Sequence, residues 1–225
     1  MDADLTLRDT SQDIAEANHR IANSLTLLTG LVRLQAHAVG KRTEPLSNVE
    51  FRLLLEGVAA RIGTIGKLHQ LLAQVPSDGT TSLRPHLREV ADTLVAALSS
   101  PEQQATVKHT GNDCLVLVRH VQPLILILCE IFINAMKYAH PSGVPLVMTV
   151  DCTRCGDGRL VLTISDDGIG LPDGFDAGKC QGLGFKVIRS LAAEVGASLD
   201  IVSSGLGLVF RLSLPAGTAA NARLA

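Results

Sequence analysis

The stretch 124–140, LILILCEIFINAMKYAH, combines a long apolar run with three polar residues at helical spacing. Glu130, Asn134 and Lys137 fall at i, i+4 and i+7, so a helix carries them in one stripe. Burying a polar group costs roughly 2–7 kcal/mol unless it finds a hydrogen-bond partner. We therefore predict a buried helix over about 121–138 whose polar stripe binds a ligand. A structural polar network inside the core is the alternative.

Two glycine-containing segments downstream add to this helix. The segment DDGIG follows a predicted strand, and its Gly168 and Gly170 permit a close approach of the backbone to a ligand. Asp166, at its start, can accept a hydrogen bond from an exocyclic amine such as that of adenine. Gly182 and Gly184 open an amphipathic helix, whose N-terminal N–H groups favour phosphate. With an Asn oxygen suited to Mg²⁺ and a Lys ammonium suited to phosphate, these segments predict a site for Mg·ATP.

The first third of the chain has the apolar spacing of two long helices. A polar loop containing Gly40 and Pro45 separates them, which indicates an antiparallel helical hairpin. The first helix has apolar residues on two sides, so we expect two hairpins to pair as a four-helix bundle in a homodimer. The two stripes comprise Ile14, Ile21, Leu25, Leu28 and Val32, then Leu46, Val49, Leu53, Val58, Ile62, Ile65, Leu68 and Leu72.

A change of pattern at 75–81, VPSDGTT, marks the predicted domain boundary. Beyond it, the chain alternates helices with short strands, which predicts an α+β fold, an α/β sandwich with helices on one face of a largely antiparallel sheet. We divide the chain into a helical hairpin over 1–78, a second domain over 79–217 and a flexible tail over 218–225. The expected helices lie near 83–98, 121–138 and 183–195, and the strands near 105–110, 115–118, 145–153, 159–165, 198–202 and 208–214.

The composition excludes several classes of protein. Twenty Lys and Arg against 22 Asp and Glu give a net charge of −2, and aromatic residues make up 3%, so neither charge nor base stacking favours nucleic acid. No apolar run approaches the roughly 20 residues that a spanning helix needs. The N-terminus, MDADLTLRDT, is acidic and polar, unlike a secretory signal. We expect a cytoplasmic protein without membrane insertion. The lone pair Cys152 and Cys155 is interpreted as flanking a hairpin rather than as a zinc site.

His19 lies on the polar face of the first predicted helix, roughly 140° from the apolar stripe. Glu16, one turn before it, and Asn23, one turn after it, share this face. A carboxylate beside an exposed imidazole can accept the proton of one ring nitrogen and leave the other free to attack. A nucleophilic histidine is therefore one interpretation, although the helix alone favours a plain solvent-facing residue.

The order of these segments resembles the core of the bacterial sensor histidine kinases, from Asp13 to about Pro215. The stretch 19–23, HRIAN, is similar to the acceptor helix of the subgroup that reads His-Arg-x-x-Asn. The stretch 130–139, EIFINAMKYA, is similar to the N box of the family. DDGIG at 166–170 and GLGFK at 182–186 are similar to its glycine boxes.

This resemblance implies a dimerising phosphoacceptor hairpin and a GHKL-type (Bergerat) ATP-binding domain that uses ATP and Mg²⁺. It implies that His19 receives the γ-phosphoryl group, with Glu16 as the acid of the acceptor helix and Asn23 completing its motif. At the nucleotide, it implies Mg²⁺ coordination by Asn134, support of the metal through water by Glu130, phosphate contact by Lys137, adenine recognition by Asp166 with Gly168 and Gly170, and anchoring of the phosphate lid by Gly182 and Gly184.

The predicted function is thus an ATP-dependent protein-histidine kinase of two-component signalling, which autophosphorylates on His19 and passes the phosphoryl group to an aspartate of a response-regulator receiver domain. The alternative is a dimeric histidine phosphotransferase or regulator-docking protein with a degenerate ATP-binding domain. The segment 205–208, GLGL, favours the alternative, because the family often has Gly-Thr there. A GHKL anti-sigma factor that phosphorylates serine is disfavoured by the acceptor helix. Few residues precede that helix, so we expect the input to come from a separate sensor protein or from the dimer itself, or to be lacking.

Overall fold

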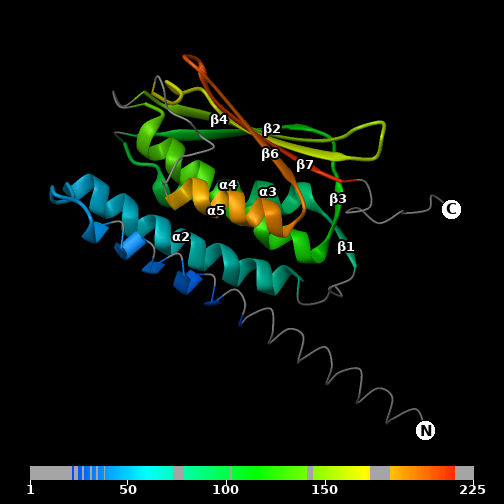
Figure 1. Ribbon diagram of the computed structural model, residues 1–225, viewed down its shortest axis with the longest axis horizontal. Helices are drawn as coiled ribbons and strands as arrows, with labels where there is room; N and C mark the ends of the chain where they lie inside the picture. Colours follow the sequence, from blue (N-terminus) through cyan, green and yellow to red (C-terminus); the bar gives the residue numbers. More distant parts are fainter. Residues whose placement is uncertain are drawn as a thin grey trace, which may run out of the picture.

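The computed structural model describes residues 39–72, 79–101, 103–140, 144–172 and 183–215, together with residues 22, 25, 26, 28–30, 32, 33 and 35–37. The predicted residues Glu16, His19, Asn23 and Gly182 lie outside the described residues, as does the predicted tail over 218–225. The described part forms three layers, with the sheet, a middle layer of helices and an outer helical segment (Figure 1).

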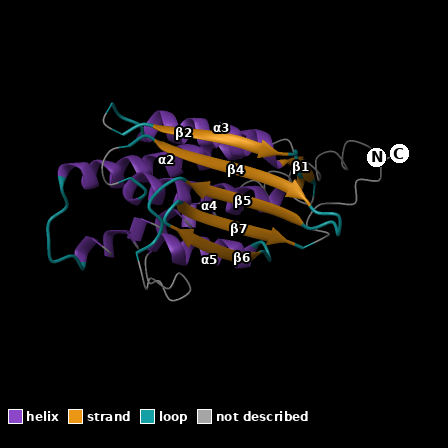
Figure 2. Cartoon of the chain, turned by 90° about the horizontal axis from the view of Figure 1, so that it is seen from above, coloured by secondary structure: helices purple, strands orange, loops and turns teal. Residues whose placement is uncertain are grey.

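The first layer is a five-stranded sheet in the order β2-β4-β5-β7-β6 (Figure 2). β2 (Ala105–Gly111) pairs in parallel with β4 (Leu146–Arg154). β5 (Leu160–Asp166), β7 (Gly207–Leu214) and β6 (Ser198–Ser204) continue the sheet through antiparallel pairs. Along β4, buried and half-buried residues alternate, because one face of the sheet packs against helices. The largely antiparallel sheet predicted from the sequence is confirmed.

Three helices cover one face of this sheet: α3 (Leu83–Leu98), α4 (Val118–Tyr138) and α5 (Leu183–Glu194). A second, two-stranded sheet pairs β1 (Thr80–Ser82) with β3 (Leu115–Leu117). β1 is a correction to the sequence analysis, which interpreted this stretch as part of a linker. Three residues beside a Pro- and Gly-containing break are too short a run to predict a strand, and Thr80–Ser82 becomes one because Leu115–Leu117 lies opposite it.

α4 is the central helix of the core. Its residues from Leu124 to Ile133 are almost entirely removed from solvent, because α4 lies between the sheet on one side and an outer helix on the other. Within the described part of the chain, α4 is the one helix long and apolar enough to cross a bilayer, and 78% of its apolar window is buried inside the protein. Burial on this scale is what a core helix shows, so the prediction of a buried helix here is confirmed.

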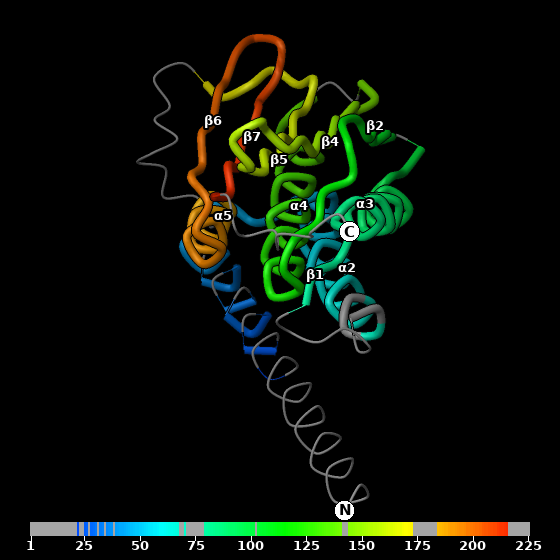
Figure 3. Tube along the Cα trace, turned by 90° about the vertical axis from the view of Figure 1, so that its right-hand side faces the viewer, coloured from blue at the N-terminus to red at the C-terminus, as the bar shows by residue number. Residues whose placement is uncertain are grey.

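The outer layer contains α2 (Asn48–Leu72), which Figure 3 shows on the side of α3 and α4 that faces away from the sheet. α2 begins with a capping box: the Ser47 Oγ accepts the N–H of Glu50 at 3.2 Å, and the Glu50 Oε2 accepts the N–H of Ser47 at 2.8 Å. Before it, the described residues between 22 and 40 are helical, and Leu28 joins the common core.

The buried face of α2 differs from the predicted apolar stripe. The stripe included Val49 and Ile62, but these side chains are 56% and 52% exposed. The face that packs on α3 and α4 has the spacing i, i+4, i+7, i+8, i+11 and i+12, and includes two polar residues. The buried Leu53 and Ile65 agree with the predicted stripe, whereas Val49 and Ile62 do not, because small and polar residues occupy much of the face that contacts α3 and α4. The buried residues are Leu53, Gly57, Ala60, Arg61, Thr64 and Ile65.

Candidate functional site

The turn that carries DDGIG lies directly against the end of α4. Asp166 is the last residue of β5, as predicted, and the Ile169 N–H donates to the Ala139 carbonyl at 3.0 Å. A Cβ at Gly168 would lie 2.5 Å from the Ala139 Cβ, so only glycine fits this contact. Gly170 has φ +73°, and a Cβ there would lie 2.2 Å from the Ser204 carbonyl oxygen. Both glycines therefore serve close backbone approaches that hold the turn in place.

Asp166 is fixed within this turn by backbone donors. Its Oδ1 accepts hydrogen bonds from the N–H of Gly168 at 3.0 Å and of Leu208 at 3.3 Å. Burial raises the pKa of the Asp166 carboxyl, and the two backbone donors counteract this only in part. The contact from position 208 comes from the main chain, so the Leu208 side chain, which replaces the hydroxyl residue expected there, does not interrupt it.

Asn134 faces the first turn of α5. A Cβ added to Gly184 would lie 2.6 Å from the Asn134 Nδ2 and 3.1 Å from its Oδ1. Because Gly184 has no side chain, the Asn134 amide can lie beside the N-terminus of α5. A hard amide oxygen beside the N-terminus of a helix is an arrangement that fits Mg²⁺ and phosphate oxygens, so these residues fit Mg·ATP.

α4 thus touches both glycine segments. Asn134 meets α5, and Ala139, five residues later and roughly 7.5 Å further along the helix axis, meets the DDGIG turn. The structure therefore brings Asn134, Gly184 and the turn of Asp166 to one end of α4, as the sequence order suggested.

Glu130, the first residue of the polar stripe, has a partner that the sequence analysis missed. Its Oε1 accepts a hydrogen bond from the Arg61 Nε of α2 at 2.6 Å, and the two side chains are 6% and 3% exposed. Lys137, the last residue of the stripe, is half-buried; burial lowers its pKa, and the Arg61 charge lowers it further. The alternative of a structural polar network is therefore correct for Glu130 in this arrangement, and its role at the metal stays a prediction. The sequence offered one signal for this partner: Arg61 is a charged residue four positions after Gly57, on the same face of α2.

A second missed residue is His140. Its Nε2 lies 2.8 Å from the Asp167 Oδ1, which also accepts the N–H of Val147 at 2.9 Å. Burial acts to raise the pKa of the Asp167 carboxyl, but the hydrogen bonds with His140 and Val147 outweigh it and hold that pKa below its usual range. The pair links the end of α4 to the residue next to Asp166, so His140 helps to hold the DDGIG turn.

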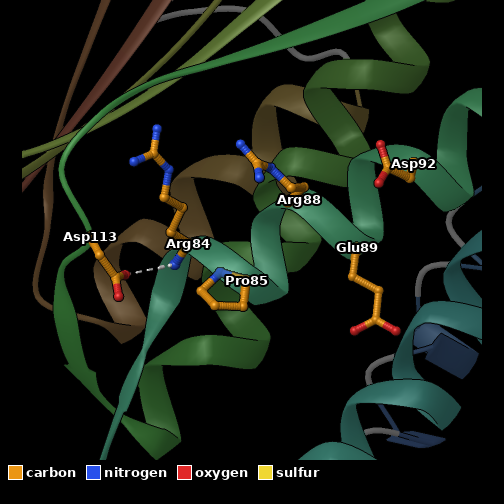
Figure 4. Close-up of a pocket in the computed structure, with 6 residues that line it drawn as sticks. All are labelled: Arg84, Pro85, Arg88, Glu89, Asp92 and Asp113. Atoms are coloured by element: carbon orange, nitrogen blue, oxygen red, sulfur yellow. Dashed lines mark hydrogen bonds between the residues drawn. The ribbon is translucent and has the colours of Figure 1, made fainter.

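A shallow pocket lies elsewhere, at the N-terminal half of α3 (Figure 4). There the Arg84 N–H donates to the Asp113 Oδ1 at 3.3 Å, and Glu89 forms an ion pair with Lys67 of α2 at 2.8 Å. None of the predicted nucleotide residues contributes to it. It is lined by Arg84, Pro85, Arg88, Glu89, Asp92 and Asp113.

Family comparisons agree with this arrangement. Residues 119–218 match the family described as "Histidine kinase-, DNA gyrase B-, and HSP90-like ATPase". This range contains α4 from its second residue onward, the DDGIG turn and α5. Residues 16–98 match the family described as "Histidine kinase". The chain belongs to the histidine kinase family. The recognition of that family from the acceptor helix, the N box and the glycine boxes is confirmed, and so is the α+β class of the fold.

Individual relatives of this histidine kinase family point the same way. The chain is 28% identical over 217 residues to the sensor histidine kinase PdtaS of Mycobacterium tuberculosis, which covers 93% of this chain and 41% of that protein. It is 22% identical over 222 residues to the blue-light-activated histidine kinase 2 of Erythrobacter litoralis, covering 92% and 58%. The chain therefore spans about half the length of the curated relatives it matches.

Among solved structures, the histidine kinase domain of the Erythrobacter litoralis EL346 blue-light activated histidine kinase superposes with a TM-score of 0.68 at 20% identity. The superposition covers 91% of each chain. At this identity the likeness concerns the fold, and it extends over the outer helical segment as well as the sheet-based domain.

Proposed function

We propose that the chain is an ATP-dependent protein-histidine kinase, and that His19 is its phosphoacceptor. The observation that carries the proposal is the meeting of three segments at one end of α4: Asn134, Gly184 and the turn of Asp166. Phosphoryl transfer depends on positioning and charge neutralisation rather than on covalent chemistry from the pocket. A site made of backbone N–H groups, one amide and one carboxylate suits that task.

Each of these residues has a proposed role at Mg·ATP. The Asp166 carboxylate, oriented through its Oδ1, accepts the adenine amine, with Gly168 and Gly170 shaping the pocket. The Asn134 oxygen coordinates Mg²⁺, which when bound neutralises phosphate charge. Lys137 contacts the phosphates through its side-chain ammonium group. We propose that Gly182 anchors the phosphate lid together with Gly184, and that Glu130 supports the metal through water.

We further propose that a ring nitrogen of His19 bonds to the γ-phosphorus of ATP while the bond to the bridging oxygen breaks and ADP leaves. Glu16 accepts the proton of the other ring nitrogen, and Asn23 completes the acceptor face. The phosphoryl group then passes to an aspartate of a response-regulator receiver domain. The proposed division of the chain into a hairpin over 1–78 and an ATP-binding domain over 79–217 follows these roles.

Dimerisation is proposed on the exposed face of α2. Phe51, Leu55 and Ile62 are 53%, 51% and 52% exposed, and they lie on the side of the helix opposite its contact with α4. Leu25 and Val32 of the preceding segment are 57% and 41% exposed. Large apolar side chains in such a row favour a helical partner, and a second copy of the hairpin supplies one.

The test of the proposal is transfer to a receiver domain. The chain is labelled with [γ-³²P]ATP, freed of nucleotide and mixed with an isolated receiver domain encoded near it. We expect label to leave the kinase and enter the receiver, and a receiver with its acceptor Asp changed to Asn to stay unlabelled. Label that stays on the chain with every receiver tried would contradict the transfer step.

One argument for the alternative function, a docking protein with a degenerate ATP-binding domain, was the Leu208 side chain. The main-chain contact of Leu208 with Asp166 weakens that argument. Calorimetry separates the two functions: the kinase binds Mg·ATP and loses binding on Asn134→Ala, whereas the docking protein shows no binding with or without the substitution.

A further inference from the structure

Arg61 and Glu130 form a buried ion pair between the two proposed domains. Arg61 lies on the helical segment and Glu130 on the N-box helix, 69 residues apart in sequence. The Nε to Oε1 distance is 2.6 Å, and both side chains are almost fully removed from water. Among the described residues, the Arg61 Nη1 has no hydrogen-bond partner. The guanidinium is thus held at this position by Glu130.

The packing around the pair makes it dependent on the contact between α2 and α4. A Cβ at Gly57 would lie 3.3 Å from the Arg61 Nη1 and 3.4 Å from the Ile133 Cδ1, so α2 approaches α4 closely where Arg61 enters. Two desolvated charges are tolerated only when each has its partner, and a single one left behind is strongly unfavourable. Undocking of α2 therefore releases both charges to water, and docking removes both.

Glu130 also belongs to the proposed nucleotide site. It lies in the same polar stripe of α4 as Asn134 and Lys137, and the positive charge of Arg61 lowers the pKa of Lys137. The Glu130 carboxylate is therefore paired with one cation, Arg61, and a second, Lys137, lies about two turns further along the same helix. A divalent cation near Asn134 would compete with the guanidinium for the same carboxylate, and it would be repelled by Arg61 at short range.

We propose that Arg61 is a latch between the helical segment and the ATP-binding domain: it occupies Glu130 while α2 is docked, and Mg-nucleotide binding competes with it. The inference rests on the proposed function, because it assigns Glu130 to the nucleotide site. Docking of α2 and loading of the nucleotide are then negatively coupled, and by reciprocity each weakens the other. Arg61 acts through Glu130 and is a positioning residue.

The first experiment follows hydrogen exchange of the α2 amides in the full chain. Without nucleotide, Arg61→Met should speed exchange over residues 53–65, because Glu130 loses its partner. The control Lys67→Met removes the exposed ion pair to Glu89 on the same helix and should leave exchange of this segment nearly unchanged. Unchanged protection in Arg61→Met would overturn the latch, whether or not the chain is a kinase.

The second experiment measures binding of the Mg²⁺ complex of the β,γ-imido analogue of ATP by calorimetry. Arg61→Met should bind it more tightly than wild type, by a factor within the roughly 5–150-fold range of coupled sites, and Lys67→Met should bind as wild type does. Weaker binding by Arg61→Met would overturn the competition. Absence of binding in every variant would contradict the proposed function instead, while the exchange experiment would still decide the docking.

A third measurement needs no variant. Addition of the same analogue with Mg²⁺ to the wild-type chain should speed exchange of the α2 amides, and the analogue with EDTA should have less effect. Slower exchange of α2 on addition of the Mg²⁺ complex would contradict negative coupling, so the proposal stays testable if Arg61→Met does not fold.

Discussion

Gly184→Ala separates nucleotide binding from folding. The added Cβ would lie 2.6 Å from the Asn134 Nδ2, where ordinary contact begins near 3.4 Å, so the amide must retreat by about 0.8 Å. The nearest atoms belong to one side chain rather than to the backbone, which makes the retreat inexpensive for the fold. In addition, alanine is favoured over glycine within a helix by about 1 kcal/mol.

The functional cost is larger. A misplacement of about 1 Å at a reacting or binding centre can cost roughly 100-fold, and loss of a group that supports a metal typically costs 10–100-fold. We therefore expect Gly184→Ala to bind Mg·ATP at least tenfold more weakly in calorimetry. Its thermal unfolding midpoint should equal or exceed that of the wild type.

The matched control is Gly63→Ala in α2, where a Cβ meets nothing within 4 Å. It should raise the unfolding midpoint by a similar amount and leave nucleotide affinity unchanged. If Gly184→Ala binds Mg·ATP with wild-type affinity, Asn134 does not bind the metal of the nucleotide from its position beside α5. A large loss of stability would refute the claim that the amide can retreat.

Three further changes test other parts of the account. Because burial raises the pKa of the Asp166 carboxyl, its ionisation lowers the stability of the fold as the pH rises through that raised pKa. In calorimetry, Asp166→Asn should therefore be at least as stable as wild type at pH 7 and should lose this advantage below about pH 4. The variant should no longer bind Mg·ATP. A less stable variant at pH 7 would argue against it. Gly168→Ala places a Cβ 2.6 Å from the Ala139 Cα, and urea unfolding should show a loss of roughly 1–3 kcal/mol; a wild-type midpoint would contradict this contact. Leu55→Glu should convert the dimer to a monomer in light scattering with little change in melting temperature, and an unchanged mass would remove α2 from the interface.

The sequence was sufficient for elements whose pattern is local. Leu124–Cys129 is apolar on all sides, which predicted a core helix for α4, and Asp166 followed a strand with glycines after it. Asn134 and Gly184 could be expected to meet because the family order places them together. These features depend on periodicity and on motifs that are written in consecutive residues.

What the sequence did not predict depends on contacts between distant segments. Arg61 lies among small residues on α2, and nothing within its own helix shows that Glu130 lies opposite. His140 follows the N-box helix, and its bond to Asp167 exists because the turn folds back onto α4. β1 forms because β3 lies beside it, and Val49 and Ile62 are exposed because α2 contacts α3 and α4 through another of its faces. In each case a partner far along the chain determines the outcome.

Autophosphorylation decides whether His19 is the phosphoacceptor of an active kinase. Purified chain is incubated with [γ-³²P]ATP and Mg²⁺, and the protein-bound label is tested in acid and in alkali. We predict an acid-labile, alkali-stable label that His19→Gln abolishes and that His37→Gln, a histidine outside the proposed acceptor motif, retains. Label that survives His19→Gln, or a wild-type chain that binds Mg·ATP and takes up no label, would contradict the assignment of His19 as the phosphoacceptor.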